Sequence, residues 1–280
     1  MQIIRTTAEM RECANQWRQA GLRVGFVPTM GYLHEGHLSL VRIANESADR
    51  TVVSIFVNPT QFGPGEDLEQ YPRDFDRDEA LCRKNEVSAV FYPSPEEMYP
   101  ANFSTWVVEE ALSGPLCGRT RPTHFRGVTT VVTKLFHVVG PCVAVFGRKD
   151  AQQALVIQRM VRDLDFPVEV VLGPIVREPD GLAMSSRNRY LSKDERERAV
   201  SISRGLRKAA ELHEAGERDG EKLMAAVREE ISAAKGRIDY VELVRCADLE
   251  AAARIQQRCL LAVAAFFGDT RLIDNCFLEP

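Results

Sequence analysis

Two histidines lie three positions apart in a segment that could hold the phosphates of a nucleotide. His34 and His37 stand in PTMGYLHEGHLSLV, residues 28–41, with Gly31 and Gly36 close to them. Imidazole groups can donate hydrogen bonds to phosphate oxygens as charge builds during attack at phosphorus, and glycines let the backbone approach a ligand closely. The segment therefore predicts phosphoryl or nucleotidyl chemistry.

Other readings of the two histidines fit the pattern less well. A zinc protease helix needs H-E-x-x-H, whereas here the second histidine comes one position early and no third ligand is evident. A pair of surface histidines at the start of a helix is the plainer alternative. The chain has no G-x-x-x-x-G-K-[ST] loop and no G-x-G-x-x-G after its first predicted long strand. A Walker-type ATPase and a dinucleotide-dependent dehydrogenase are therefore not supported.

Three further segments carry polar residues, and two of them directly follow predicted strands, as the histidine segment does. NPTQFG (58–63) and FGRKDAQQ (146–153) each follow a predicted strand, and MSSRNR (184–189) lies in a loop farther along. The uncharged amides of Gln61 and Gln153 could bind a hydroxyl and a carboxylate. Four other side chains suit a triphosphate, namely Lys149, Ser185, Ser186 and Arg187. Each segment is a weak signal alone, and their joint placement raises the significance of all.

The elements that position these segments alternate between strand and helix. A buried strand at 23–28, a helix over 36–49 and a second strand at 51–57 form one βαβ crossover, which predicts a parallel sheet. The alternation continues with further predicted helices at 7–20, 73–85, 127–140 and 151–164 and strands at 88–92 and 142–147. We expect a Rossmann-like, doubly wound α/β domain over residues 1–175, with the polar segments at the carboxyl ends of its strands.

The pattern changes beyond residue 175. Two charged amphipathic helices at 191–216 and 219–236 precede three apolar strands, at 238–244, 258–267 and 270–278. This order predicts a smaller α+β domain over residues 176–280. Because MSSRN lies just past the boundary, we expect this domain to act as a lid over the nucleotide, with the junction loop as its moving part.

Composition limits the partners. The chain has 280 residues, 45% of them hydrophobic, a net charge of -4 and a pI near 5.8, which argues for small-molecule partners and against nucleic acid. Its seven cysteines are scattered, odd in number and never in a C-x-x-C pair, as expected of reduced thiols in the cytoplasm. No apolar run is long enough for a membrane helix, and no signal segment opens the chain. We therefore expect no membrane association.

Two weaker signals need an interpretation. The acids of DFDRDE (74–79) resemble the start of a calcium loop, but Glu79 stands at the glycine position and Asn85 at the twelfth. We interpret these acids as the solvated start of a helix. His124, in RPTHFRG, either belongs to the site or caps a turn, and the sequence leaves both open.

Four motifs together resemble one enzyme family. PTMGYLHEGH, SIFVNPTQFGPGEDLEQYPR, FG-x-KD-x-QQ and LAMSSRNRYL match, in order and spacing, the motifs of the pantoate:β-alanine ligase (pantothenate synthetase) family of the cytidylyltransferase-like nucleotidylyltransferase superfamily. The resemblance spans nearly the whole chain. His-x-Gly-His alone is shared with nucleotidylyltransferases and class I aminoacyl-tRNA synthetases, whereas the NPTQFG and MSSRN segments are much more specific.

The resemblance implies an ATP-driven condensation in two steps. The pantoate carboxylate attacks the α-phosphate of ATP to give pantoyl adenylate and pyrophosphate, and the amine of β-alanine then displaces AMP to give pantothenate. Magnesium accompanies the triphosphate as part of the substrate, and the resemblance implies no metal ligands from the protein. It also implies a homodimer.

Site residues follow from the resemblance position by position. The catalytic residues are His37, which family descriptions make a proton donor, His34 and Lys149. Gln61 and Gln153 match the pantoate-binding glutamines, and Gln61 also lies near β-alanine. The residues that match the ATP site are Met30, Gly31, Tyr32, Leu33, His34, Glu35, Gly36, His37, Gly147, Arg148, Lys149, Asp150, Val176, Met184, Ser185, Ser186 and Arg187.

One departure and two alternatives stand beside this reading. Members of the family usually carry Glu where this chain has Arg148, which matters only if that side chain points toward the site. An adenylyltransferase that stops after AMP transfer would need a basic pocket for a phosphorylated acceptor, whereas Gln61 and Gln153 suit an uncharged hydroxy acid. A nucleotide-binding module without turnover would not be expected to retain both histidines and Lys149.

Overall fold

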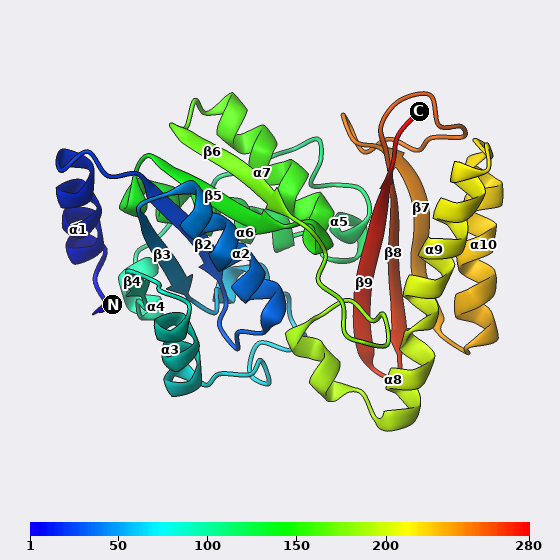
Figure 1. Cartoon of the computed structure of the whole chain (residues 1–280), viewed down its shortest axis with the longest axis horizontal. Coiled ribbons are helices and arrows are strands. Elements are labelled where there is room, and N and C mark those ends of the chain that lie inside the picture. The colour runs from blue at the N-terminus through cyan, green and yellow to red at the C-terminus, as the bar shows by residue number, and fades with distance from the viewer. The chain divides into compact units, whose positions relative to one another are not determined.

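The computed structural model describes residues 1–280 and divides the chain into two compact units. The first unit comprises Met1–Arg148 with Gln152–Pro174, and the second comprises Lys149–Ala151 with Ile175–Pro280. Figure 1 shows the helices and strands of each. No helix is both long enough and apolar enough to cross a membrane.

A six-stranded parallel sheet organises the first unit. Its strand order is β1-β4-β3-β2-β5-β6, so the chain moves outward from β2 in both directions and creates a switch point between β2 and β5. The predicted doubly wound class is confirmed. The strands are β1 (Gln2–Ile4), β2 (Val24–Thr29), β3 (Arg50–Ile55), β4 (Ala89–Phe91), β5 (Cys142–Gly147) and β6 (Val168–Gly173).

Helices connect these strands close to where the hydrophobic periodicity predicts them. The four predicted helices correspond to α1, α3, α6 and α7, and the helix of the first crossover corresponds to α2. The elements are α1 (Thr7–Gln19), α2 (Glu35–Ser47), α3 (Phe75–Lys84), α4 (Pro95–Met98), α5 (Cys117–Thr120), α6 (His124–Val139) and α7 (Ala151–Asp163), with the 3-10 turns η1 (Pro59–Gln61) and η2 (Arg148–Asp150). Strands β1 and β6 and helices α4 and α5 were not predicted; β1, α4 and α5 have only three or four residues, too few to show periodicity.

Alternation along the central strands gives the sheet two hydrophobic faces. Phe26 of β2 belongs to a core that includes residues of α1, α6 and α7, whereas its neighbour Val27 packs with residues of α2 and α3. The same division separates Val52 from Val53 on β3. Because both faces are buried, the strands appear in the sequence as continuous apolar runs.

The second unit is an antiparallel sheet with helices against it. The strand order is β7-β8-β9, and α9 and α10 lie side by side along this sheet (Figure 1). A separate hydrophobic core joins its helices and strands. The elements are η3 (Ser186–Tyr190), α8 (Lys193–Ala199), α9 (Ser201–Glu214), α10 (Gly220–Ala233), β7 (Arg237–Arg245), β8 (Cys259–Phe267) and β9 (Thr270–Leu278).

One predicted helix of this unit is wrong in its extent. The segment 191–216 forms two helices, because the chain leaves regular α-helical geometry at Val200, with φ -59° and ψ -19°. The turn there leaves Ala199 and Ile202, on either side of it, both buried. The charge pattern continues across the break, so periodicity alone did not reveal it.

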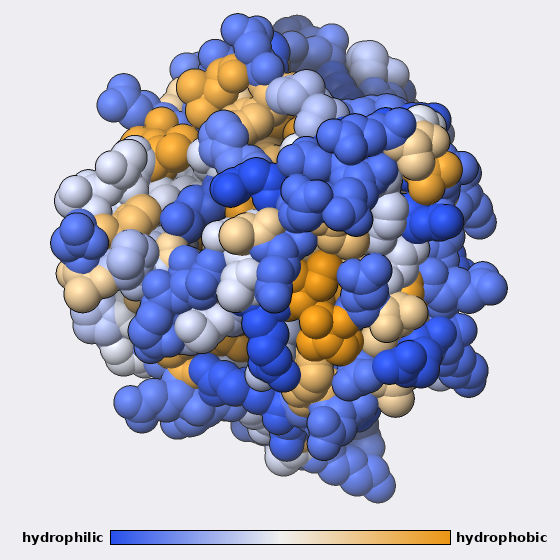
Figure 2. Space-filling view, turned by 90° about the vertical axis from the view of Figure 1, so that its left-hand side faces the viewer, coloured by the Kyte–Doolittle hydropathy of each residue, from blue (hydrophilic) through white to orange (hydrophobic).

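Charged side chains cover much of the surface. Figure 2 shows one face of the molecule, on which hydrophilic residues predominate and hydrophobic ones form small groups bordered by them. This distribution fits a chain in which 27% of residues are charged. Small, interrupted apolar groups are normal on the surface of a folded protein.

Candidate functional site

Three of the polar segments singled out in the sequence follow central strands of the parallel sheet, β2, β3 and β5. β2 ends at Thr29 and leads into the histidine segment, and β3 ends at Ile55 and leads into η1. β2 pairs with β3 on one side and with β5 on the other. Because the strands are parallel, their carboxyl ends lie at one edge of the sheet, which is where ligands bind in such folds.

The two histidines lie together at the start of α2. His34 is the residue that caps the helix and His37 is its third residue, and their ring centroids are 4.1 Å apart with 32° between the ring planes. The backbone N–H of His34 donates to Nδ1 of His37 at 3.3 Å. Since Nδ1 of His37 accepts, the neutral ring carries its proton on Nε2, which is then its donor nitrogen.

The turn from β2 into α2 holds its backbone donors with side chains. Gly31 N–H donates to Thr29 Oγ1 at 3.1 Å, and the N–H groups of Tyr32 and Leu33 donate to Asp78 at 2.6 and 2.7 Å. Gly31 and Tyr32 both have positive φ, +82° and +50°. The chain therefore makes a tight turn with two residues in the left-handed backbone region, and this turn leads directly into α2.

The first amides of α2 remain directed out of the helix. The N–H groups of His37 and Leu38 both bond to the carbonyl of His34, at 2.8 and 3.1 Å. Those of Glu35 and Gly36 precede them and have no acceptor within the helix. Together with the helix dipole, two such donors beside two imidazoles can bind an anion such as phosphate.

Asp78, on α3, differs from the solvated acid that the sequence suggested. Only 1% of its surface is exposed, and its two carboxylate oxygens each accept one of the amides described above. Burial raises the pKa of its carboxyl above the usual value. The two N–H donors and the charge of Arg77 lower it and offset this only in part. The prediction that the acids of residues 74–79 are all solvated is therefore wrong for Asp78, whereas Asp74 does cap α3.

The side-chain amide of Gln61 is oriented by its neighbours. Asn58, which is 1% exposed, donates from Nδ2 to Oε1 of Gln61 at 3.1 Å, and Nε2 of Gln61 lies 3.2 Å from Sδ of Met30. Asn58 is itself held, because its Oδ1 accepts from the hydroxyl of Tyr99 at 2.9 Å. The amide of Gln61 therefore presents its NH₂ group as a donor.

The backbone of Gln61 is held from another direction. His124 Nδ1 lies 2.9 Å from the carbonyl oxygen of Gln61, and Arg121 donates to the same oxygen at 3.2 Å. Arg121 also pairs with Glu66, at 2.5 and 2.8 Å. Burial raises the pKa of the Glu66 carboxyl, but hydrogen bonding and charge from Arg121 outweigh burial and lower it. His124 thus supports the main chain at Gln61.

The two glutamines that open α7 have different surroundings. Gln152 is buried, accepts from Cys117 N–H at 3.1 Å and donates to the carbonyls of Leu112 and Pro115 at 2.9 and 2.7 Å. Gln153 is partly exposed and makes no such bonds to the loop. The structure therefore leaves Gln153, and not Gln152, available for a ligand.

In the second unit, the Lys149 segment is tied to the last strand. Asn275, on β9, donates to the carbonyl of Lys149 at 2.9 Å, and Nζ of Lys149 lies 3.5 Å from the Asp150 carboxylate. The Lys149 side chain is 22% exposed. Arg148, the departure from the family pattern, belongs to the first unit and is exposed.

The Ser-Ser-Arg loop of the second unit is tied to the same strand. Met184 N–H donates to the carbonyl of Val176 at 3.0 Å, so the two residues face each other across a narrow hairpin. Beside Val176, Arg177 forms a paired contact with Asp274 of β9, at 2.6 and 3.2 Å. Ser185 Oγ accepts from Arg187 N–H at 3.3 Å, which shapes the turn that carries Ser186 and Arg187.

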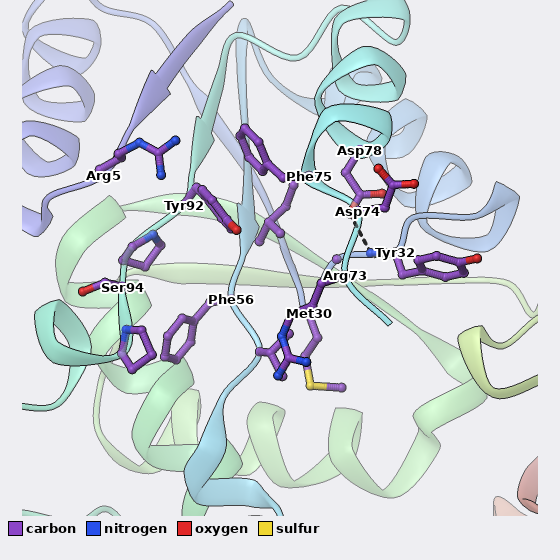
Figure 3. A pocket seen from close by; sticks show the side chains of 15 residues that line it. Arg5, Met30, Tyr32, Phe56, Arg73, Asp74, Phe75, Asp78, Tyr92 and Ser94 are labelled. Atoms are coloured by element: carbon purple, nitrogen blue, oxygen red, sulfur yellow. Dashed lines mark hydrogen bonds between the residues drawn. The ribbon is translucent and has the colours of Figure 1, made fainter. Parts of the chain in front are cut away.

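A cavity of about 330 Å³ opens among the carboxyl ends of β1 to β4 (Figure 3). Met30, Gly31 and Tyr32, three of the predicted ATP residues, line part of it. Arg5, which follows β1, lies over the ring of Tyr92, which follows β4, at 5.0 Å from the ring centroid. The cavity's position after four parallel strands is that of a ligand site in this class of fold.

Several residues that hold the predicted segments, in one unit or the other, were not identified from the sequence. Asn58 stands within NPTQFG and could have been noticed as a polar residue directly after a buried strand. Asp78 and Asp274 gave no usable signal, because an acid in a charged helix start or in a strand near the end of the chain is usually solvated.

Comparison with known proteins gives a consistent result. The family model for pantoate-beta-alanine ligase matches residues 2–277. Pantothenate synthetase of Thermotoga petrophila is 57% identical over 99% of this chain and 100% of its own, and pantothenate synthetase 1 of Bradyrhizobium diazoefficiens is 55% identical over 100% and 99%.

Solved structures agree in fold. Pantothenate synthetase from Thermus thermophilus superposes with a TM-score of 0.93 at 46% identity and covers 100% of both chains. The pantoate-beta-alanine ligase of Francisella tularensis, solved in complex with beta-gamma ATP and beta-alanine, has a TM-score of 0.82 at 31% identity over 99% of this chain and 97% of its own.

The close contact between α6 and η1 yields a prediction about stability. A Cβ added at Gly127 would lie 2.4 Å from the Thr60 carbonyl oxygen and 2.6 Å from the Gln61 nitrogen. Gly127→Ala should therefore push η1 away and cost about 1 to 3 kcal/mol of unfolding free energy, as overpacking usually does. Urea denaturation measures this, with Gly114→Ala as control because a Cβ there meets nothing within 4 Å. Equal stability of the two variants would contradict the tight contact.

Proposed function

The chain belongs to the pantoate-β-alanine ligase family, and from that premise we propose how its residues share the work of the reaction. The reaction is the ATP-dependent ligation of pantoate and β-alanine. We propose that it proceeds through pantoyl adenylate. A pantoate carboxylate oxygen attacks the α-phosphorus and pyrophosphate leaves; the β-alanine amine then attacks the acyl carbon, AMP leaves, and the amine releases its proton.

The nucleotide role is assigned to the start of α2. His34 and His37, whose ring centroids are 4.1 Å apart, would meet the negative charge that builds on the phosphates, and Nε2–H of His37 would act as the donor. The amides of Glu35 and Gly36 would bind phosphate oxygens at the helix N-terminus. This arrangement of two imidazoles and two open amides at one helix start is the observation that carries the proposal.

The acid and amine roles are assigned to the two glutamines. Gln61 Oε1 already accepts from Asn58, so Nε2 would donate to pantoate, and we place β-alanine near the same residue. Gln153 would bind pantoate from the start of α7. Amides without charge suit a substrate with a hydroxyl and a carboxylate.

The remaining triphosphate contacts are assigned to residues of the second unit and to the residues next to Lys149 in the sequence. Lys149 would neutralise phosphate charge, and Ser185, Ser186 and Arg187 would bind phosphate oxygens. Gly147, Arg148, Asp150, Val176 and Met184 would complete the nucleotide site. The structure of the Francisella tularensis relative with beta-gamma ATP and beta-alanine supports an ATP site and an amine site in one protein.

Three further assignments accompany the reaction. ATP would enter with Mg²⁺ as part of the substrate, because magnesium is usually bound through substrate phosphates rather than by a dedicated protein cage. We propose that the enzyme is a homodimer, which size-exclusion chromatography with light scattering would test. A cytoplasmic location is proposed because seven cysteines that form no disulfide suit a reducing compartment, and fractionation of the source cells would test it.

The experiment that tests the function is pantoate-dependent exchange of pyrophosphate into ATP. If the adenylate forms without β-alanine, labelled pyrophosphate should exchange into ATP when pantoate is present and β-alanine is absent. Addition of β-alanine should then release AMP and pantothenate. Absence of exchange, with pantothenate still formed, would replace the two-step course with another. Exchange without amide formation would favour an adenylyltransferase.

The histidine assignment predicts a large loss of turnover. His37→Ala or His34→Ala should lower turnover by about 10²-fold or more, because removing one preorganised donor costs about 2.7 to 4 kcal/mol in the transition state. Steady-state pantothenate formation measures this, with circular dichroism to confirm the fold. His137→Ala, an exposed histidine on α6, is the control. Near-normal turnover in both site variants would remove the histidines from the mechanism.

The glutamine assignment predicts a selective effect on the acid. Gln153→Ala should raise the KM for pantoate while calorimetric affinity for ATP stays close to wild type, since an unpaired polar partner in a buried site costs about 1 to 3 kcal/mol. Gln158→Ala on the same helix should change neither value. Loss of ATP affinity with an unchanged KM for pantoate would show that the residue belongs to the nucleotide site.

We propose that residues 176–280 form a lid and that residues 1–175 carry the ATP and pantoate sites. Closure over the nucleotide would exclude water from the mixed anhydride, which hydrolyses readily. Hydrogen exchange across residues 176–190 should slow when ATP and pantoate are both bound, and Arg187→Ala should weaken that protection. Strand β7 is the internal reference. Unchanged exchange in the loop would refute the lid and leave the ligase chemistry intact.

A further inference from the structure

A single buried acid outside the family motifs holds the turn that leads to the histidines. Asp78 lies on α3, more than forty residues after this turn, and accepts from Tyr32 through Oδ2 and from Leu33 through Oδ1. Figure 3 shows its carboxylate directed at the backbone nitrogen of Tyr32. The two bonds, at 2.6 and 2.7 Å, are shorter than usual for N–H···O bonds, as expected for an ionised acceptor.

The turn needs acceptors that its own main chain does not provide. Gly31 and Tyr32 have positive φ, so the N–H groups of this segment do not continue the ladder of the sheet and do not yet belong to the helix. Gly31 bonds to Thr29 and His34 bonds to His37, which leaves the two middle amides to Asp78. A buried N–H without an acceptor would be costly, so the geometry of the turn depends on this carboxylate.

Arg77, the neighbour of Asp78, packs against the same turn. Its guanidinium lies over the ring of Tyr32, 5.1 Å from the centroid, and approaches the Asp78 carboxylate at 3.6 Å. A Cβ at Gly31 would meet Asp78 Oδ2 at 3.0 Å and Ile55 Cγ2 at 2.9 Å, so the turn fits between α3 and the end of β3 without spare room. The first turns of α3 therefore fix residues 31–33 from one side.

We infer that Asp78 is a positioning residue for catalysis: it sets the turn of residues 31–33 so that His34, His37 and the open amides of α2 meet the phosphates in a fixed arrangement. This inference rests on the proposed role of the histidines. Asp78 would act through the backbone, since both of its carboxylate oxygens accept main-chain amides of the turn. Fixing a catalytic group matters because a displacement of about 1 Å can cost about 10²-fold in rate.

The test is Asp78→Asn in the full-length enzyme, with Asp76→Asn as the matched control. Asp76 stands on the same helix, is exposed and loses the same charge. The carboxamide introduced at position 78 keeps one acceptor and turns an NH₂ group toward the other backbone N–H. We expect kcat of pyrophosphate exchange to fall about 10- to 100-fold per folded molecule. The KM for β-alanine should stay within about twofold of wild type, since only the phosphate-binding turn is disturbed.

Hydrogen exchange separates positioning from mere stabilisation. In wild type the amides of Tyr32 and Leu33 should be protected without ligand, and in Asp78→Asn they should exchange faster while the strands of the sheet stay protected. Unprotected amides in wild type would overturn the inference even if the variant failed to fold. Wild-type kcat per folded molecule in Asp78→Asn would also overturn it.

The outcome is distinguishable from a failure of the proposed histidine roles. If the alanine variants of both histidines are fully active while Asp78→Asn is impaired, the turn matters but the histidines do not carry the chemistry. If the histidine variants are impaired and Asp78→Asn is not, only the positioning inference fails.

Discussion

Backbone amides that leave a strand and have not yet joined a helix must find acceptors, and this requirement shapes the start of α2. Between Thr29 and Glu35 the chain reverses through two residues of positive φ. Side chains satisfy each N–H from residue 31 to residue 34, so the pattern stops at the two amides that open the helix. The donors that remain are those best placed for an anion.

Hydrogen bonds from neighbouring side chains also fix the orientation of the Gln61 amide. An isolated glutamine amide can present either its oxygen or its NH₂ group, and at a ligand site that ambiguity weakens recognition. Asn58 removes it by occupying Oε1, and Tyr99 fixes Asn58 in turn. Burial raises the pKa of the Tyr99 hydroxyl to about 12, so it remains a proton donor throughout the neutral range. The orientation of the Gln61 amide thus depends on Asn58 and, through it, on Tyr99.

The sequence predicts those features of the structure that depend on residues near one another in the chain. It does not predict features that depend on contacts between residues far apart in the chain. The apolar runs 23–28 and 142–147 and the helical spacing over 36–49 report local periodicity, and each corresponds to an element of the parallel sheet. The break at Val200 depends on packing within the second unit, which charge periodicity does not encode. Asp78 was assigned to solvent because nothing near it in the sequence indicates two backbone donors more than forty residues earlier. Local motifs predicted where the chemistry lies, whereas the groups that hold these segments in place are far away in the sequence.

In the second unit, side chains of strand β9 hold two separate loops in place by hydrogen bonds. Asp274 holds Arg177, next to Val176, and Asn275 holds the carbonyl of Lys149. Asp274 Oδ1 also accepts from the N–H of Asn275 at 2.8 Å, so the two anchors are linked through one carboxylate. Asp274 is 4% exposed, and removing it would leave the Arg177 guanidinium without its buried partner. Because adjacent residues of one strand hold both loops, a displacement of β9 would move Lys149 and the Val176 hairpin together. The Lys149 segment and the Val176 hairpin, which lie apart in the sequence, are therefore both anchored to β9 within the second unit.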